Sequence, residues 1–265
     1  MRDKFNNYSE QEFRKEELLA LVASNLELDE SRIRKMVSAY QAVNGVFKNN
    51  EGFFKDYEVN VYAQGSLRIG TTIKPLANKE FDLDIVLRVD DSYLNHTPKE
   101  IYDQVYQVLD NHGIYSPLLE KKNRCIRIKY NSDFHMDILP GCMITQENSR
   151  IMIPNDKRLV EWTRTDPKKY AAWFKEISEK HKPDFMLTIR REMLVKAEVH
   201  TEELPSHLYI KTPLQRTVQL VKRYRDLYYA HKDPEKSPAI SSIVLTTLLA
   251  KSYNDELSIQ AAIKN

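Results

Sequence analysis

The chain has 265 residues, of which 42% are hydrophobic and 29% are charged, so it is long enough to bury a core as one large domain or two smaller ones. Its 40 Lys and Arg nearly balance its 38 Asp and Glu, and the net charge of +2 excludes a generic polybasic coat for nucleic acid. Two cysteines, Cys125 and Cys142, are too few for a disulfide framework or a cysteine zinc cluster, and they indicate a reducing compartment.

No segment of the sequence has the pattern of a secretory signal or a membrane span. Residues 1–17 contain no apolar run of the kind found in signal peptides. The most apolar stretch, residues 240–250, includes two serines and two threonines and is too short and too polar to cross a bilayer. We therefore expect a cytoplasmic protein without a membrane partner.

Helix signals are legible along much of the chain. Asp29 precedes apolar residues at helical spacing over residues 33–47, which predicts a helix there. Four later helices are predicted where a capping residue is followed by proline, because proline at the first helical position loses no backbone hydrogen bond. These pairs are Thr97-Pro98, Asp166-Pro167, Thr212-Pro213 and Ser237-Pro238. Gly113 is the predicted stop of the helix that begins at Pro98.

The middle of the chain has a period of two, which is typical of strands. Alternating apolar residues predict strands over 57–63 and 81–89, and shorter ones over 124–130 and 133–139. From about residue 150 onward the pattern predicts mainly helices. We therefore expect an α+β protein in which residues 1–150 form leading helices and a mixed sheet, and residues 151–265 form a helical domain.

The last residues have the pattern of a helix that has only begun. Asn254-Asp255 is typical of a helix start, yet few apolar residues follow before Asn265. We therefore expect the helical domain to be incomplete at its C-terminus, with the natural end of the protein further on.

Two aspartates share one face of the predicted strand over 81–89. Residues i and i+2 of a strand point to the same side, so Asp82 and Asp84 project together while the odd-numbered apolar residues face a core. Adjacent carboxylates repel each other, and a divalent cation such as Mg²⁺ removes that penalty by bridging them. For an isolated pair of this kind, an edge strand with a solvated acidic face is the alternative.

Asp137 is a third candidate, on the predicted strand over 133–139. Apolar residues occupy the other face of this strand. If it lies beside the strand over 81–89, three carboxylates meet on one surface, which is the ligand set for two metal ions that activate a hydroxyl and stabilise a leaving pyrophosphate. Surface polarity is the alternative for Asp137. We expect His135, on the same face, to be a surface or hydrogen-bonded histidine rather than a ligand.

A glycine turn stands between the first two predicted strands. Gly65 permits close approach of the backbone, and Ser66 offers a hydroxyl and an N–H, so this turn can form a concave anion site. The turn is not a Walker A loop, because Thr71 occupies the position of the lysine. A Gly-Ser turn followed by Asp82-x-Asp84 is more specific than either motif alone.

Together these residues resemble the signature of the DNA polymerase β-like nucleotidyltransferases. The fuller run Gly65-Ser66-x-Arg68-x-Gly70-Thr71 is similar to the cyclic-oligonucleotide synthases related to cyclic GMP-AMP synthase, whose bacterial branch is called the CD-NTases and acts in CBASS antiviral defence. The resemblance covers residues from about 30 to the end. It implies a polymerase β-like nucleotidyltransferase core, a mixed sheet with flanking helices, followed by a helical C-terminal domain.

The resemblance also implies a role for each candidate residue. Asp82, Asp84 and Asp137 would be the catalytic carboxylates and would hold two ions of Mg²⁺ or Mn²⁺. The donor triphosphate would lie against Gln64, Gly65, Ser66, Arg68, Lys222, Ser241 and Ser242. Ser242 is preferred over Ser241 by register, since a phosphate is favoured at the first turn of a helix. A charge in a solvated Lys-Arg cluster is the alternative for Lys222.

The implied activity is synthesis of a cyclic di- or trinucleotide from ATP or other nucleoside triphosphates, by attack of a ribose hydroxyl on the α-phosphorus with release of pyrophosphate. The product would signal to an effector protein that is not stably bound, and an activating partner protein is left open. One alternative keeps the fold and transfers the nucleotide to a linear oligonucleotide, an RNA 3′ end, an antibiotic or a protein. A non-catalytic nucleotide sensor is the other.

Small basic clusters and the intact carboxylates weigh against these alternatives. Residues 121–124 and Arg190-Arg191 offer little positive surface, so we expect no strong nucleic-acid binding. A sensor would need a broken metal site, and all three aspartates are present. Two family features are missing: Ile243 stands where some relatives have a base-stacking tyrosine, and the cysteines for a zinc insertion are lacking.

Overall fold

The computed structural model describes residues 9–76, 80–130, 134–144, 149–180, 211–233, 235 and 237–265. Contacts divide the chain into two compact units. The sheet unit comprises residues 29–68 and 75–172, and the helical unit comprises residues 1–28, 69–74 and 173–265. The domain boundary expected at residue 150 stays a prediction, and Arg190-Arg191 lies outside the described residues.

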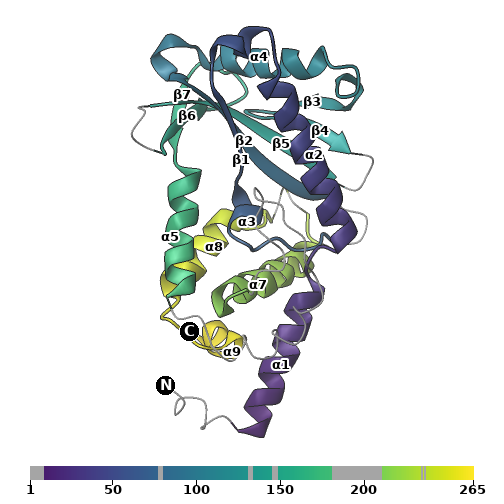
Figure 1. Cartoon of the computed structure of the whole chain (residues 1–265). Helices are drawn as coiled ribbons and strands as arrows, with labels where there is room; N and C mark the ends of the chain where they lie inside the picture. The colour runs from purple at the N-terminus through teal and green to yellow at the C-terminus, as the bar shows by residue number, and fades with distance from the viewer. Residues whose placement is uncertain are drawn as a thin grey trace. The chain divides into compact units, whose positions relative to one another are not determined.

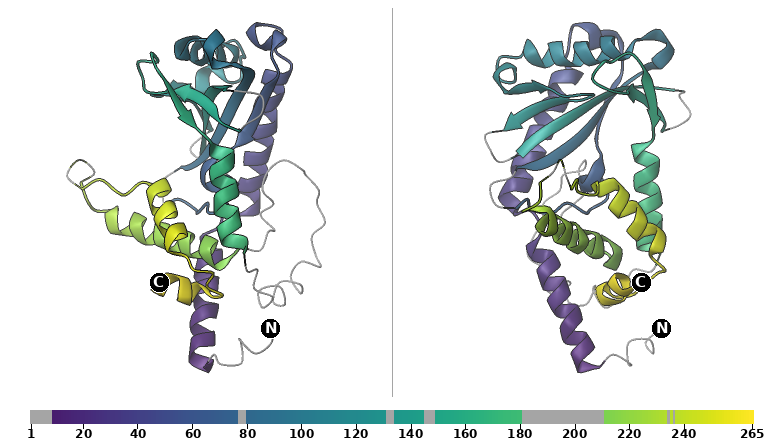
Figure 2. Two further views of the ribbon diagram at one scale, coloured as in Figure 1. Left: turned by 90° about the vertical axis from the view of Figure 1, so that its left-hand side faces the viewer. Right: turned by 180° about the vertical axis from the view of Figure 1, so that it is seen from behind.

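The sheet unit is built on a seven-stranded mixed sheet (Figure 1). Its strands are β1 (Val59–Ala63), β2 (Phe81–Ser92), β3 (Leu119–Lys121), β4 (Ile126–Tyr130), β5 (Phe134–Met143), β6 (Ile151–Pro154) and β7 (Trp162–Thr165). The order is β1-β2-β5-β4-β3, with β6 pairing with the end of β5 and with β7. Strands β2 and β5 run parallel and the other pairs are antiparallel, which confirms the mixed sheet. Figure 2 shows the twist of this sheet from behind.

Helices complete the sheet unit on the expected pattern. Helix α2 (Glu30–Lys48) begins after the cap Asp29, and α4 (Pro98–Asp110) begins after Thr97. The two helices pack against each other and against the strands. Short helical turns are α3 (Gly65–Arg68), η2 (Phe53–Asp56), η3 (Tyr93–Asn95) and η4 (Ser116–Leu118). Helix α4 ends with Asn111 as its C-cap, two residues before the predicted stop at Gly113.

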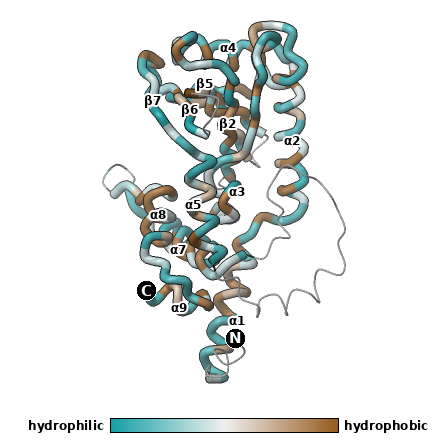
Figure 3. Tube along the Cα trace, turned by 60° about the vertical axis from the view of Figure 1, so that its left-hand side comes forward, coloured by the Kyte–Doolittle hydropathy of each residue, from teal (hydrophilic) through white to brown (hydrophobic). Residues whose placement is uncertain are grey.

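Alternation along β2 places its apolar residues in the core. Leu83, Ile85 and Leu87 have no exposed surface, whereas Asp82 is exposed and Asp84 is half-buried on the other face. Figure 3 shows hydrophobic residues in brown along β2 and β5. The carboxylate face is itself apolar further along, where Val86 packs with Tyr62 and Leu139. Burial on both faces around Val86 therefore fixes the register of β2.

The helical unit contains α1 (Glu10–Asn25), α7 (Pro213–Tyr229), α8 (Ser242–Ser252), α9 (Ile259–Lys264) and the later part of α5 (Pro167–Glu179). Helix α7 begins at the predicted cap and proline, with a capping box between Thr212 and Gln215. None of the helices in the described part of the chain is long and apolar enough to cross a membrane.

Residues 151–154 and 162–165 form the short strands β6 and β7, which the sequence analysis did not predict within the mainly helical C-terminal half. Two local predictions for this half were wrong. Helix α8 begins at Ser242 and not at Pro238. The last helix begins at Ile259, after the cap Ser258, because Asp255 adopts a positive φ of 60° that interrupts any helix starting at Asn254.

The capping box of α4 provides a test of local stability. The Thr97 hydroxyl accepts the backbone N–H of Glu100, and the Glu100 carboxylate accepts that of Thr97. We expect Thr97→Ala to lower the free energy of unfolding by about 1 kcal/mol, since the backbone N–H of Glu100 loses its partner. Urea denaturation measures this change, and Lys99→Ala in the same turn serves as the control. Equal stability of the Thr97→Ala protein and the wild type would contradict the assignment.

Candidate active site

Strand register brings the three predicted carboxylates onto one surface of the sheet. In the parallel pair β2 and β5, Asp84 lies opposite Asp137, and Asp82 lies opposite His135. Partners in register point to the same face of a sheet, and so do residues two apart on one strand. Asp82, Asp84 and Asp137 therefore form a single acidic cluster, as the sequence predicted from separate strands.

The glycine turn packs directly against the middle carboxylate. Gly65 follows β1 with a φ of +61°, a conformation that favours glycine, and it opens the single turn α3. The backbone N–H of Gln64 donates to the Asp84 carbonyl at 2.9 Å. A Cβ atom on residue 65 would lie 2.7 Å from Asp84 Oδ2, so only glycine allows this approach.

The other residues of the turn lie at the same edge of the site. Ser66 is partly exposed in the first turn of α3. Arg68 bends back, and its Nη1 donates to the Ala63 carbonyl at 3.3 Å. Its guanidinium lies 5.8 Å from the centre of the Tyr62 ring. Gln64, Gly65, Ser66 and Arg68 are thus placed beside Asp84, and their contact with a triphosphate stays a prediction.

Burial and repulsion from its neighbours raise the pKa of the Asp84 carboxyl. Shielding from water disfavours its charged form, and the negative charges of Asp82 and Asp137 add to the effect. Together these raise the pKa of Asp84 from 3.8 to about 6. Carboxylates with pKa values raised in this way are typical of functional sites.

The two outer carboxylates each have a basic side chain as partner. His135 is buried between Asp82 and Glu80, with Nε2 at 2.6 Å from Asp82 Oδ1 and Nδ1 at 3.0 Å from Glu80 Oε2. Arg127 on β4 lies opposite Asp137 and donates to both of its carboxylate oxygens. The bond to Asp82 is the main reason that the pKa of His135 is raised above 6.5.

The raised pKa of His135 can be measured by NMR titration of its ring. We expect a pKa above 6.5 in the wild type, and a lower value in the Asp82→Asn protein because the main stabilising charge is gone. A pKa raised on folding stabilises the protein below 6.5, and this contribution is lost as the pH rises through the folded value. An identical titration of His135 in both proteins would contradict the ion pair.

The charges of the site fit divalent cations. Among the described residues, no three His, Cys, Asp or Glu side chains already converge closely enough to form a metal centre. Within the same residues, the Asp84 carboxylate makes no ion pair, although it is largely shielded from water between two other negative charges. Hard oxygen donors with uncompensated negative charge are what Mg²⁺ and Mn²⁺ bind.

Lys222, Ser241 and Ser242 belong to the helical unit. Lys222 is not in a solvated cluster: it is buried on α7, and its Nζ donates to the Thr71 carbonyl at 3.1 Å. Ser241 is the N-cap of α8, and the Ser242 hydroxyl accepts from Arg225 Nη1 at 2.9 Å. Participation of these three residues in triphosphate binding stays a prediction.

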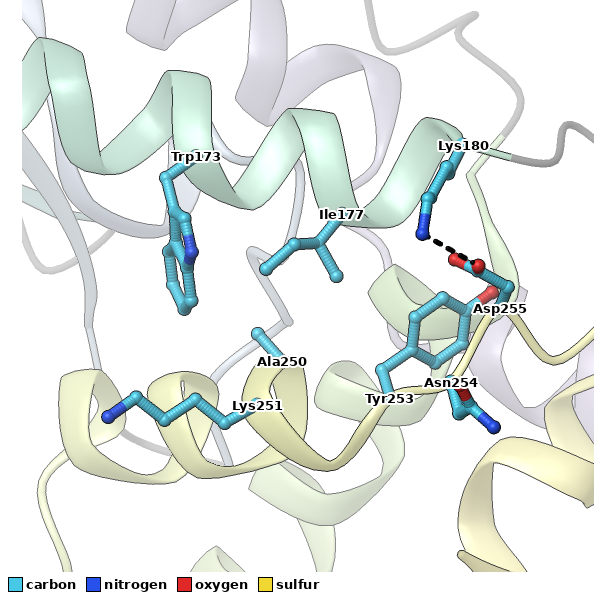
Figure 4. Close-up of a pocket in the computed structure, with 8 residues that line it drawn as sticks. All are labelled: Trp173, Ile177, Lys180, Ala250, Lys251, Tyr253, Asn254 and Asp255. Carbon is cyan, nitrogen blue, oxygen red and sulfur yellow. Dashed lines mark hydrogen bonds and ion pairs between the residues drawn. The ribbon is translucent and has the colours of Figure 1, made fainter.

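The helical unit also has a pocket, which contains none of the predicted site residues. It is lined by Trp173 and Ile177 from α5 and by residues at the end of α8, including Ala250 and Tyr253 (Figure 4). An ion pair of 3.0 Å between Lys180 and Asp255 closes one side.

Sequence reasoning missed Arg127 and the full role of His135. Arg127 alternates with Ile126 and Ile128, a pattern that places it on the polar face of its strand. Pairing the predicted strands over 124–130 and 133–139 as a hairpin would have set it opposite Asp137. His135 is hydrogen-bonded as predicted, but it is buried rather than on the surface.

The mixed sheet with flanking helices has the fold of the polymerase β-like CD-NTases. Residues 15–177, more than half of the chain, match the model of the Second Messenger Oligonucleotide or Dinucleotide Synthetase domain, SMODS. The chain belongs to this family, which confirms the resemblance to the CD-NTases.

Two curated relatives align with most of this chain. A protein of Roseivirga ehrenbergii named c-di-GMP synthase is 37% identical over 244 residues, which are 92% of this chain and 62% of the relative. The cyclic dinucleotide synthase CdnG of Bradyrhizobium diazoefficiens is 26% identical over 239 residues, which are 84% of this chain and 56% of the relative. The chain thus spans less than two thirds of the length of either relative.

Solved structures show the same fold at low sequence identity. The structure of the Bradyrhizobium diazoefficiens CD-NTase CdnG in complex with GTP is similar with a TM-score of 0.73 and 21% identity, covering 92% of this chain and 72% of that one. The Escherichia coli DncV structure in its 3′-deoxy GTP bound form has a TM-score of 0.64 and 16% identity, covering 92% and 74%.

Proposed function

We propose that this protein is a metal-dependent nucleotidyltransferase that makes a cyclic dinucleotide from GTP. The observation that carries the proposal is the cluster of Asp82, Asp84 and Asp137 beside the Gly65 turn. The relative named c-di-GMP synthase supports a guanine dinucleotide in particular. The sequence alone predicted a cyclic di- or trinucleotide and left the bases open. The proposal here is a dinucleotide whose bases are both guanine.

Each candidate residue of the sheet unit would have its own role in the reaction. Asp82 and Asp84 would hold the ion on the donor triphosphate, and Asp137 would complete the position of a second ion. Held there, two such ions would supply the chemistry of lowering the pKa of the attacking hydroxyl and neutralising charge on the leaving pyrophosphate. The Ser66 hydroxyl and the neighbouring N–H groups would orient the triphosphate.

The proposed reaction is an in-line displacement at the α-phosphorus. A 2′- or 3′-hydroxyl oxygen of the acceptor loses its proton and forms the new P–O bond, while the bond between the α-phosphorus and the bridging oxygen breaks and pyrophosphate leaves. A second transfer within the linear product closes the ring. Such a product would act as a second messenger in the cytoplasm, read by a separate effector in antiviral signalling.

Product analysis with single and mixed nucleotides tests the choice of substrate. The protein is incubated with each labelled nucleoside triphosphate and Mg²⁺ or Mn²⁺, treated with phosphatase, and analysed by chromatography and mass spectrometry. GTP alone is expected to give a phosphatase-resistant product with the mass of cyclic di-GMP. A product that forms only when ATP is present, or only phosphatase-sensitive products, would contradict the proposal.

A further inference from the structure

Arg127 contacts both carboxylate oxygens of Asp137. Its Nε lies 2.7 Å from Asp137 Oδ1 and its Nη2 lies 2.8 Å from Asp137 Oδ2. Both side chains are largely buried, with exposed fractions of 23% for Arg127 and 17% for Asp137. A guanidinium and a carboxylate joined by two parallel hydrogen bonds are fixed in direction as well as in charge.

The three carboxylates of the acidic cluster differ in whether a basic side chain contacts them. Two of the three carboxylates have a basic partner in the protein itself: Asp137 contacts the permanently charged Arg127, and Asp82 contacts His135. Asp84 has no such partner among the described residues. Each Asp137 oxygen accepts from the guanidinium, so an ion bound there must share or displace a hydrogen bond and lie close to a fixed positive charge.

We propose that Arg127 is a positioning residue that holds Asp137 in place before the substrates bind, and that it weakens the binding of a second divalent cation while nucleotide is absent. Asp84 and Asp82 then take up the first ion, and Asp137 serves the second ion only when the negative charge of the triphosphate is present to offset the guanidinium. This inference rests on the proposed function and adds an order of assembly to it.

Counting bound Mn²⁺ by electron paramagnetic resonance, without nucleotide, tests the role of Arg127. Arg127→Met removes the charge but keeps a long side chain, and we expect its second Mn²⁺ to bind about tenfold tighter than in the wild type. Arg127→Lys keeps the charge but loses the two-pronged geometry, and we expect a smaller increase. The matched control is Lys129→Met, which removes a charge two residues along the same strand, where Lys129 pairs with Glu120 and not with Asp137.

Each outcome has a defined meaning. Tighter second-ion binding in Arg127→Met, with Lys129→Met unchanged, supports the proposal. Unchanged or weaker second-ion binding in a folded Arg127→Met protein overturns it, as does an equal gain in Lys129→Met. If Arg127→Met does not fold, the Arg127→Lys protein decides, and unchanged affinity there overturns the proposal. A wild type that binds no Mn²⁺ even with GTP would contradict the proposed function itself, and the role of Arg127 with it.

Discussion

Replacing Asp84 with asparagine is expected to abolish nucleotidyl transfer and, at neutral pH, to raise the free energy of unfolding. The loss of activity should reach about a thousandfold, because Asp84 is the middle carboxylate of the proposed metal site and no neighbour replaces it. The gain in stability follows from the removal of a buried negative charge that Asp82 and Asp137 repel. A residue that serves only the fold would change both quantities in the same direction.

The size and pH dependence of the gain follow from the raised pKa of Asp84. Folding shifts that pKa from 3.8 to about 6, so the charged carboxylate destabilises the folded protein at pH 7 by about 2 to 3 kcal/mol. Below pH 3.8 the group is protonated in both states and the penalty vanishes. The advantage of Asp84→Asn should therefore grow between about pH 4 and pH 6 and stay constant above that range.

Urea denaturation at several pH values, with and without Mg²⁺, measures this effect. Mg²⁺ is expected to stabilise the wild type more than the Asp84→Asn protein, because a bound cation offsets the repulsion. Asp103→Asn on α4 is the control for loss of one carboxylate elsewhere in the sheet unit. An Asp84→Asn protein that is less stable than the wild type at pH 7, or that keeps full activity, would contradict the account.

Gly65→Ala is expected to displace Asp84, and so to lower both stability and turnover. The added methyl group would lie 2.7 Å from Asp84 Oδ2, and residue 65 would have to keep a φ of +61°. The backbone strain alone should lower the free energy of unfolding by about 1 to 2 kcal/mol. Displacement of Asp84 should reduce turnover about a hundredfold, because catalytic geometry tolerates shifts of less than an ångström poorly.

Gly113→Ala provides a matched control in the same unit. A Cβ at Gly113 meets no atom within 4 Å, and its φ is not positive. We therefore expect the turnover and the free energy of unfolding of Gly113→Ala to stay close to the wild-type values, whereas both fall in Gly65→Ala. Wild-type turnover in Gly65→Ala would show that Asp84 does not depend on this close approach.

The carboxylate site could be predicted from the sequence because apolar residues alternate with the aspartates in the part of each strand that carries them. The apolar alternation around Leu83 and Met136 fixes which way Asp84 and Asp137 point, whatever the partner strands are. The sequence alone did not establish that β2 pairs with β5, since parallel neighbours are distant in sequence. The structure shows this pairing and places Asp84 opposite Asp137.

Features that depend on tertiary contacts were harder to predict. Strands β6 and β7 have four residues each, too few to show a period, and they are defined by pairing with β5 and with each other. Burial of Lys222 against Thr71 depends on a contact between residues 151 positions apart. Arg127 was missed for the same reason, because its importance comes from the strand beside it and not from its own neighbours in sequence.

The most direct test of the central claim is product formation from GTP and Mg²⁺ by the wild type, Asp137→Asn and Asp103→Asn proteins. Asp137 comes from a different strand than Asp82 and Asp84, so its effect tests whether the three carboxylates act as one site. The account predicts a phosphatase-resistant cyclic dinucleotide from the wild type and from Asp103→Asn, and none from a folded Asp137→Asn protein. Equal product from Asp137→Asn would contradict it.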